Sequence, residues 1–178
     1  FSMGAVPGKT YVVIWTTTTW TLPANVAICL GPNFDYALLK ANREGETEYY
    51  VVAKELAANV MQEAGIEEYE IIGTVKGSEL EYVECAHPFL DRKSILILGD
   101  HVTLDSGTGC VHTAPGHGMD DFMVVTQHYP EIPFTVPVDS EGRMTEEAGF
   151  SAGLTTDEAS KVIAKHIHES GHLLATKK

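Results

Sequence analysis

Hydrophobic and β-branched residues gather along the chain in short runs, and most of these runs have the length of a strand. The runs that predict strands cover residues 10–16 (TYVVIWT), 26–30, 34–40, 47–53, 70–76, 94–98, 110–113 and 134–138. The third and fourth of them predict a hairpin, because Glu44 and Gly45 between them favour a tight turn.

Apolar residues at helical spacing predict three helices. These cover residues 54–64, 119–128 and 156–169. In the second, Phe122, Val125 and Tyr129 fall on one face. Thr156 or Asp157 is the predicted N-cap of the third, and a glycine follows both the first and the third as a stop signal. The stretch 80–92 reads as a loop with a short helical turn.

Many short strands with two or three helices predict an α+β fold with a β-barrel-like core and peripheral helices. The chain has 178 residues, enough for one hydrophobic core, and shows no internal repeat. We predict one domain over residues 10–175. Residues 1–9 are interpreted as an expression scar and linker, and residues 176–178 as a linker.

Charge limits the partners that such a domain can hold. The formal net charge is −13, and the basic residues occur singly or in pairs. Long-range attraction to a phosphate backbone is therefore weak or repulsive, and any nucleic-acid contact must be short and made at a terminus. Cys29, Cys85 and Cys110 form no CxxC pair, which indicates reduced thiols in a cytosolic protein. No apolar run approaches the roughly 20 residues of a membrane span.

The first segment that suggests a function is 16–21, which reads TTTTWT. Consecutive threonines favour strands, so β-propensity alone is one explanation. Five hydroxyls within six residues also offer uncharged hydrogen-bonding groups to an ester or a ribose. Trp20 could serve equally as a core residue or as a stacking platform for a base.

The second such segment is 107–122, GTGCVHTAPGHGMDDF. Its glycines let a ligand approach the backbone. His112 and His117 converge with two aspartates where strand, loop and helix meet. Both aspartates fall in the first turn of the predicted helix, where the macrodipole favours carboxylates. Asp120 is explained by that position, whereas Asp121 is available to bind a cation.

These residues leave three classes of function open. One is metal-assisted hydrolysis with His112, His117 and Asp121 as ligands, although no HxH, HxxxH or HExxH spacing supports it. A second is metal-free hydrolysis of an activated ester by a positioned water. The third is a ligand-binding module without catalysis. A covalent mechanism lacks a nucleophile, because there is neither a GxSxG elbow nor a reactive cysteine motif.

Residues 16–25 (TTTTWTLPAN) and 107–122 closely resemble the two signature segments of the editing domain of isoleucyl-tRNA synthetase. The likeness extends, less sharply, from about Thr10 to the last helix. The valyl and leucyl relatives differ, with an arginine-proline-acid stretch where this chain has Thr18-Thr19-Trp20 and an aspartate where it has Gly118. The family usually has proline where this chain has Thr19.

The resemblance implies a domain inserted in a class I synthetase, with the editing-domain fold of that class. It implies hydrolysis of valine wrongly attached to the tRNA for isoleucine, and of valyl-adenylate. The implied partners are the 3′-terminal CCA end of that tRNA, the valine moiety and the rest of the synthetase, with no membrane. HIGH and KMSKS signatures are absent, so ATP and Mg belong to a synthetic domain outside this chain, and this domain needs no cofactor. The expected protein is a cytoplasmic monomer.

The resemblance also assigns residues, with no metal and no general base. Asp121 would bind the α-ammonium of the amino acid, and His112 would be the wall that rejects isoleucine. The groups around the ester and the hydrolytic water would be Thr16, Thr17 and Thr18. The other substrate-binding and supporting positions would be Trp20, Thr21, Asn25, Cys110, Val111 and His117. Among these, the backbone from Cys110 to His112 would hold the terminal adenosine.

Overall fold

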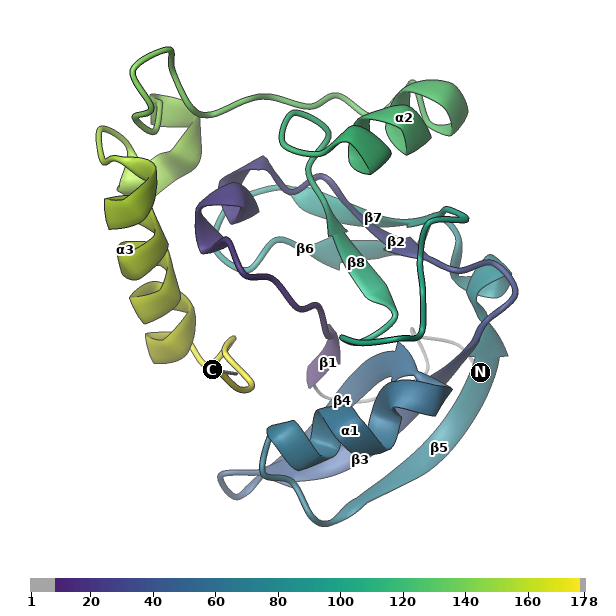
Figure 1. Cartoon of the computed structure of the whole chain (residues 1–178). Coiled ribbons are helices and arrows are strands. Elements are labelled where there is room, and N and C mark those ends of the chain that lie inside the picture. The colour runs from purple at the N-terminus through teal and green to yellow at the C-terminus, as the bar shows by residue number, and fades with distance from the viewer. Residues whose placement is uncertain (1–8, 177–178) are drawn as a thin grey trace.

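Two four-stranded sheets form the centre of the computed structural model, which describes residues 9–176 (Figure 1). The first sheet has the strand order β1 (Lys9–Val12), β4 (Glu46–Ala53), β3 (Asp35–Arg43) and β5 (Tyr69–Lys76). In this sheet β1 runs parallel to β4, and the other neighbours are antiparallel.

The second sheet contributes the strand that carries the predicted imidazole. Its order is β6 (Glu84–Ala86), β7 (Lys93–Leu98), β2 (Ala27–Leu30) and β8 (Cys110–Thr113). β8 lies at the edge and pairs antiparallel with β2. The predicted α+β fold is confirmed, with the strands arranged as two open sheets and not as a closed barrel.

The hairpin of β3 and β4 turns where the sequence predicts. Glu44 and Gly45 both have positive φ, 54° and 82°, and Arg43 pairs with Glu46 across them. Two left-handed residues give a turn whose twist matches that of the strands, and glycine adopts this conformation without strain.

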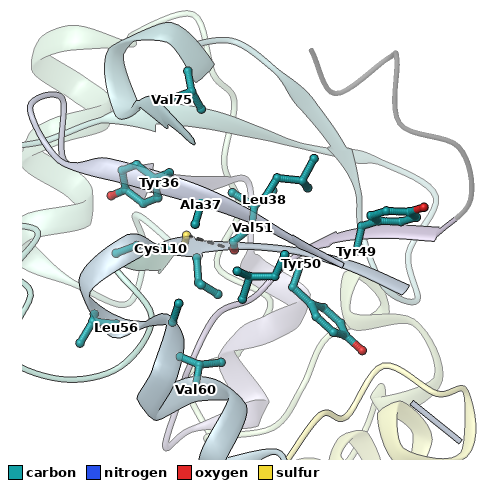
Figure 2. Packing of buried hydrophobic residues seen from close by; sticks show 14 of the residues in the cluster. Tyr36, Ala37, Leu38, Tyr49, Tyr50, Val51, Leu56, Val60, Val75 and Cys110 are labelled. Atoms are coloured by element: carbon teal, nitrogen blue, oxygen red, sulfur yellow. Dashed lines mark hydrogen bonds between the residues drawn. The ribbon is translucent and has the colours of Figure 1, made fainter. Parts of the chain in front are cut away.

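The main core lies between the two sheets and under α1 (Ala57–Glu63), which a 3-10 turn (Lys54–Leu56) precedes. Figure 2 shows Leu56 and Val60 of this helical segment beside Val51 and Cys110. The Cys110 thiol reaches the Val51 carbonyl at 3.8 Å. The predicted helix over residues 54–64 is thus confirmed, with a 3-10 first turn.

Two further helices complete the layers. α2 (Met119–His128) buries Val125 against the outer face of the second sheet. α3 (Thr156–Glu169) packs Ile163 against Leu22 of the 3-10 helix η2 (Thr19–Ala24). Both α-helices have the bounds that the spacing of apolar residues predicts. Within the described residues, no helix has the length and apolar character that crossing a bilayer requires.

Several local predictions are wrong. The run 10–16 is a strand only as far as Val12, because the chain then leaves β4 to reach η2. Residues 134–138 form no strand; this stretch leads from α2 toward α3 and makes only the isolated bridge of Val138 with Met144. Strand β6 lies inside the predicted loop 80–92, which also includes the end of the 3-10 turn Gly77–Leu80.

Two side-chain predictions on the helices are also wrong. The N-cap of α3 is Thr155, whose hydroxyl oxygen accepts a hydrogen bond from the Glu158 amide at 3.2 Å, in place of Thr156 or Asp157. Phe122 does not share the buried face of Val125, because it is 42% exposed. Helical spacing alone does not reveal how wide the covered face of a helix is.

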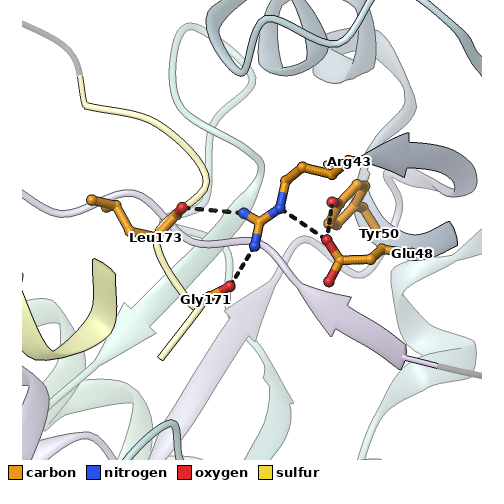
Figure 3. Close-up of polar contacts among 5 residues, drawn as sticks. All are labelled: Arg43, Glu48, Tyr50, Gly171 and Leu173. Atoms are coloured by element: carbon orange, nitrogen blue, oxygen red, sulfur yellow. Dashed lines mark hydrogen bonds and ion pairs between the residues drawn. The ribbon is translucent and has the colours of Figure 1, made fainter. Parts of the chain in front are cut away.

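The chain that follows α3 is anchored to the first sheet by Arg43 (Figure 3). The guanidinium donates to the carbonyls of Gly171 at 2.5 Å and Leu173 at 3.1 Å. Its Nε lies 2.9 Å from Glu48, whose carboxylate also accepts the Tyr50 hydroxyl at 3.0 Å. Since the Glu48 side chain is only 5% exposed, these partners replace the water that its carboxylate loses on burial.

Replacing Arg43 by Met should destabilise the fold, because it leaves the buried Glu48 carboxylate without its cation. We expect a loss of about 2 kcal/mol in the free energy of unfolding, measured by urea denaturation. Lys165→Met is the matched control, since the Lys165–Glu169 pair is exposed and 3.9 Å long. It should change stability by less than about 0.5 kcal/mol. Equal losses in the two variants would contradict the role of Arg43.

Candidate functional site

The threonine-rich segment is a folded turn and not a strand end. The amide of Thr18 donates to the Thr16 hydroxyl oxygen at 3.1 Å. The Thr18 carbonyl accepts from both the amide and the hydroxyl of Thr21, at 3.1 and 2.8 Å. Thr17 and Thr18 are exposed, so their hydroxyls are the groups of this turn that a ligand can reach.

The His112 imidazole of β8 is held on both of its nitrogens. Nδ1 lies 2.7 Å from the Asn25 side-chain nitrogen, and Nε2 lies 2.9 Å from the Thr21 hydroxyl. The amide nitrogen can only donate, so Nδ1 is the acceptor. The Thr21 hydroxyl gives its single proton to Thr18, so it accepts from Nε2. The ring is therefore fixed as the neutral Nε2–H tautomer.

Burial supports the same protonation state. Loss of hydration, together with the smaller effect of the neighbouring imidazoles of His87 and His117, lowers the pKa of His112 from 6.5 to about 4. At neutral pH the ring carries no charge, and it has no free lone pair with which to accept a proton. His112 can therefore shape the site but cannot act as a general base.

His87 is a supporting residue that the sequence did not reveal. Its Nε2 donates to the Leu22 carbonyl of η2 at 2.8 Å, and its Nδ1 accepts from the amides of Phe89 and Leu90. Burial lowers the pKa of His87 to about 4. It lies within a segment predicted as loop, with no motif around it, so only the folded structure brings it beside η2.

Asp121 lies in the first turn of α2 and points back toward the end of β8. Its carboxylate accepts from the Ala114 amide at 2.9 Å. The helix begins at Gly118, where a Cβ would come within 3.1 Å of the carboxylate, so the glycine leaves room for it. Burial raises the pKa of Asp121, and the hydrogen bond from Ala114 opposes that rise. Asp120 next to it is exposed.

Trp20 and His117 join η2 to the loop between β8 and α2. Their rings meet edge to face, with centroids 5.0 Å apart. The His117 Nε2 atom is buried and has no hydrogen-bond partner within residues 9–176. Burial lowers the pKa of His117, while the nearby Asp121 raises it. This buried nitrogen is thus an unsatisfied polar atom close to the Asp121 carboxylate.

Most of the predicted site residues therefore come together around the end of β8. Two of them, Cys110 and Val111, pack their side chains into the hydrophobic clusters on the two faces of the second sheet. The Cys110 side chain is buried toward the core, and burial raises the pKa of its thiol. The Val111 carbonyl accepts from the Thr113 hydroxyl at 3.0 Å.

His112 and Asp121 line neither of two cavities in the structure. One, of about 630 Å³, lies behind the turn, with Thr16, Thr19 and Asn25 in its wall. The other, of about 510 Å³, lies beside α2 and is lined by Asp120 and His101. The candidate site therefore reaches the first cavity through Thr16 and Asn25, whereas His112 and Asp121 lie outside both cavities.

The donor set does not suit a metal ion. Both His112 nitrogens are already engaged in hydrogen bonds, and one of them carries the proton. In the part of the chain that the structure describes, no three His, Cys, Asp or Glu side chains are placed to hold a metal together. The geometry therefore favours the metal-free alternatives.

Solved structures share this arrangement of sheets and helices. The structure of GlLeuRS-CP1 has a TM-score of 0.76 at 14% identity and covers 97% of this chain and 87% of its own. The cytosolic leucyl-tRNA synthetase editing domain of P. knowlesi has a TM-score of 0.71 at 10% identity, over 92% and 83% of the two chains. The fold is thus that of an aminoacyl-tRNA synthetase editing domain.

Sequence comparison identifies the particular family. No protein-family model matches the chain. The isoleucine–tRNA ligase of Caldicellulosiruptor bescii is 54% identical over 170 residues, and that of Geobacillus thermodenitrificans 52% over 171 residues. Each alignment covers 96% of this chain but only 18% of the ligase. The chain belongs to the isoleucine–tRNA ligase family and spans about a fifth of the length of these relatives.

The low pKa of His112 predicts how stability depends on pH. The unfolded chain takes up a proton near pH 6.5, whereas folded His112 does so only near pH 4. The free energy of unfolding should therefore fall as pH drops through this window, by up to about 1.4 kcal/mol per pH unit from this residue. Below pH 4 the contribution stops changing, because both states are protonated.

Urea denaturation at several pH values tests this dependence. His112→Gln should make the decline between pH 6.5 and 4 shallower. His128→Gln, at an exposed position of α2, should leave it unchanged. Parallel pH profiles for wild type and His112→Gln would show that the imidazole is not held neutral.

Proposed function

We propose that this chain is the editing domain of its ligase and hydrolyses valine from wrongly charged tRNA for isoleucine. The observation that carries the proposal is the meeting of a carboxylate, a neutral imidazole and a hydroxyl-rich turn at the end of β8. Membership of the isoleucine–tRNA ligase family and the editing-domain fold support it.

The chemical need for such a site follows from the similarity of the two amino acids. One methylene in an apolar pocket is worth only ~1–3 kcal/mol, a limit for which isoleucyl-tRNA synthetase is itself the standard worked example. A synthetic site therefore admits some valine. A second site that excludes isoleucine by steric overlap corrects these errors.

Asp121 would bind the α-ammonium group of the attached amino acid. Its partly buried carboxylate faces the end of β8, and the start of α2 stabilises its negative charge. An ammonium group arriving there replaces lost hydration with an ion pair, which offsets the effect of burial on the carboxylate. This contact orients the ester relative to the turn.

His112 would limit the size of the side chain, with Thr21 beside it. A ring hydrogen-bonded at both nitrogens cannot easily swing aside for the extra methylene of isoleucine. Its neutrality also suits contact with a hydrocarbon, because a charged imidazolium would lose hydration on contact with valine.

The hydrolytic water and the ester would lie by the exposed hydroxyls of Thr17 and Thr18, with Thr16 holding the turn. His117 would support the site from beside Asp121, with its ring packed against Trp20. The backbone of Cys110 and Val111 would receive the terminal adenosine. Rate enhancement would come from positioning and neutral donors, without a general base or a metal.

The net charge of −13 supports the view that different parts of the ligase bind different parts of the tRNA. The rest of the protein would bind the body of the tRNA, and this domain only its 3′-terminal CCA end. Three free cysteines support a cytoplasmic location. We propose that the ligase acts there as a monomer.

Asp121→Asn in the ligase that contains this chain should reduce the deacylation of valyl-tRNA on the order of 100-fold, because the charged contact to the ammonium is lost. Isoleucine-dependent ATP–pyrophosphate exchange, which reports activation, should be unchanged. Asp120→Asn is the matched control, since this carboxylate is exposed and should be dispensable. Full deacylation by the Asp121 variant would remove this residue from the mechanism. Binding of a valyl-adenosine analogue by a wild-type ligase that never hydrolyses valyl-tRNA would instead favour a binding module.

A further inference from the structure

Thr19 connects the start of η2 to helix α3. Its hydroxyl donates to the Ser160 carbonyl at 2.8 Å, across 141 positions of sequence. A carbonyl oxygen has two lone pairs, so Ser160 can accept this bond and still take part in its own helix. A partly buried side chain thus connects residues 16–21, the threonine turn, to a helix that contributes no residue to the proposed site.

The threonine turn is held at its other end by different contacts. Leu22 packs against Ile163 of α3, and Thr21 is tied to His112. The hydrogen bonds among Thr16, Thr18 and Thr21 fix the shape of the turn but not its place on the domain. Thr19 lies between these groups, at the point where the exposed hydroxyls leave η2.

We propose that Thr19 is a positioning residue for hydrolysis at the neighbouring hydroxyls, an inference that rests on the proposed editing function. The bond to Ser160 holds the first residue of η2, so that Thr17 and Thr18 present their hydroxyls in a fixed place. The Thr19 hydroxyl donates its proton to α3 and therefore has none to give to the substrate. A displaced turn would lose rate even with every other site residue present.

The test compares five variants of the ligase that contains the chain, three at Thr19 and two controls elsewhere. Thr19→Val keeps the shape of the side chain and removes the donor. It should lower kcat for deacylation of valyl-tRNA about threefold to tenfold, the effect of one neutral hydrogen bond, with KM little changed. Thr19→Ser restores the donor and should recover most of the rate.

Thr19→Pro tests whether a fixed backbone conformation at residue 19 is sufficient without the hydroxyl group. Proline fixes φ at about −65° and is well tolerated at the first position of a helix. It should therefore keep the turn in place without the bond, and its rate should stay near that of wild type. A proline variant as slow as Thr19→Val would overturn the positioning role.

Two controls separate positioning from stability. Ile163→Val loosens the packing of α3 on η2, and should lower the melting temperature with little effect on deacylation. Thr126→Val removes a hydroxyl that bonds the Phe122 carbonyl of its own helix at 2.7 Å, and should be neutral. Equal rates for Thr19→Val and wild type, or an equal rate loss in Ile163→Val, would overturn the inference.

Hydrogen exchange of the amides over residues 16–21 measures how firmly the threonine turn is held in place, and it does not depend on catalytic activity. Thr19→Val should exchange faster there than wild type, whereas Thr19→Pro and Thr126→Val should not. Unchanged exchange in Thr19→Val would overturn the inference. A wild-type ligase that fails to deacylate valyl-tRNA would instead refute the proposed function, so the two failures can be distinguished.

Discussion

The arrangement of the candidate site at the end of β8 depends first on the two hydrogen bonds that hold the His112 ring. They join an edge strand to Thr21 of η2 and to Asn25 directly after η2, both remote from His112 in sequence, and they fix the imidazole as neutral. Without them, burial of the ring would leave two polar nitrogens unsatisfied, at a cost of about 1–3 kcal/mol each. With them, a titratable residue is held in place and uncharged at neutral pH. His87 is likewise hydrogen-bonded at both ring nitrogens, and its Nε2 donates to the Leu22 carbonyl of η2.

The second feature of the site is the negatively charged carboxylate of Asp121. Asp121 keeps its carboxylate at the start of α2 because Gly118 has no side chain to fill the space and Ala114 donates an amide. The site thus combines an anionic group with a neutral ring. In the proposed editing reaction, that combination would bind the ammonium group common to amino acids and discriminate between their side chains by size. Such local recognition would also be compatible with the strongly acidic composition of the domain, under the proposal that it acts on the end of a tRNA.

Local signals in the sequence predicted most of the elements that carry the site. β8, α2 and α3 have the predicted bounds, because apolar spacing and glycine or threonine boundaries mark them. The segment 16–21 was the main exception. Its β-propensity favoured a strand, yet Thr19–Ala24 forms a 3-10 helix, since contacts to α3, His87 and His112 outweigh that preference. The roles of His87, Thr19 and Arg43 depend on partners remote in sequence, which no local pattern could indicate.

The central claim is that a held, neutral imidazole beside an anchored carboxylate measures the size of an amino acid. Titration of the ligase with non-hydrolysable valyl-adenosine and isoleucyl-adenosine analogues tests it most directly. The account predicts that the valyl analogue binds at the end of β8 and that the isoleucyl analogue binds at least about tenfold more weakly, with His112→Ala reducing the difference. Equal affinities for the two analogues in the wild-type protein would contradict it.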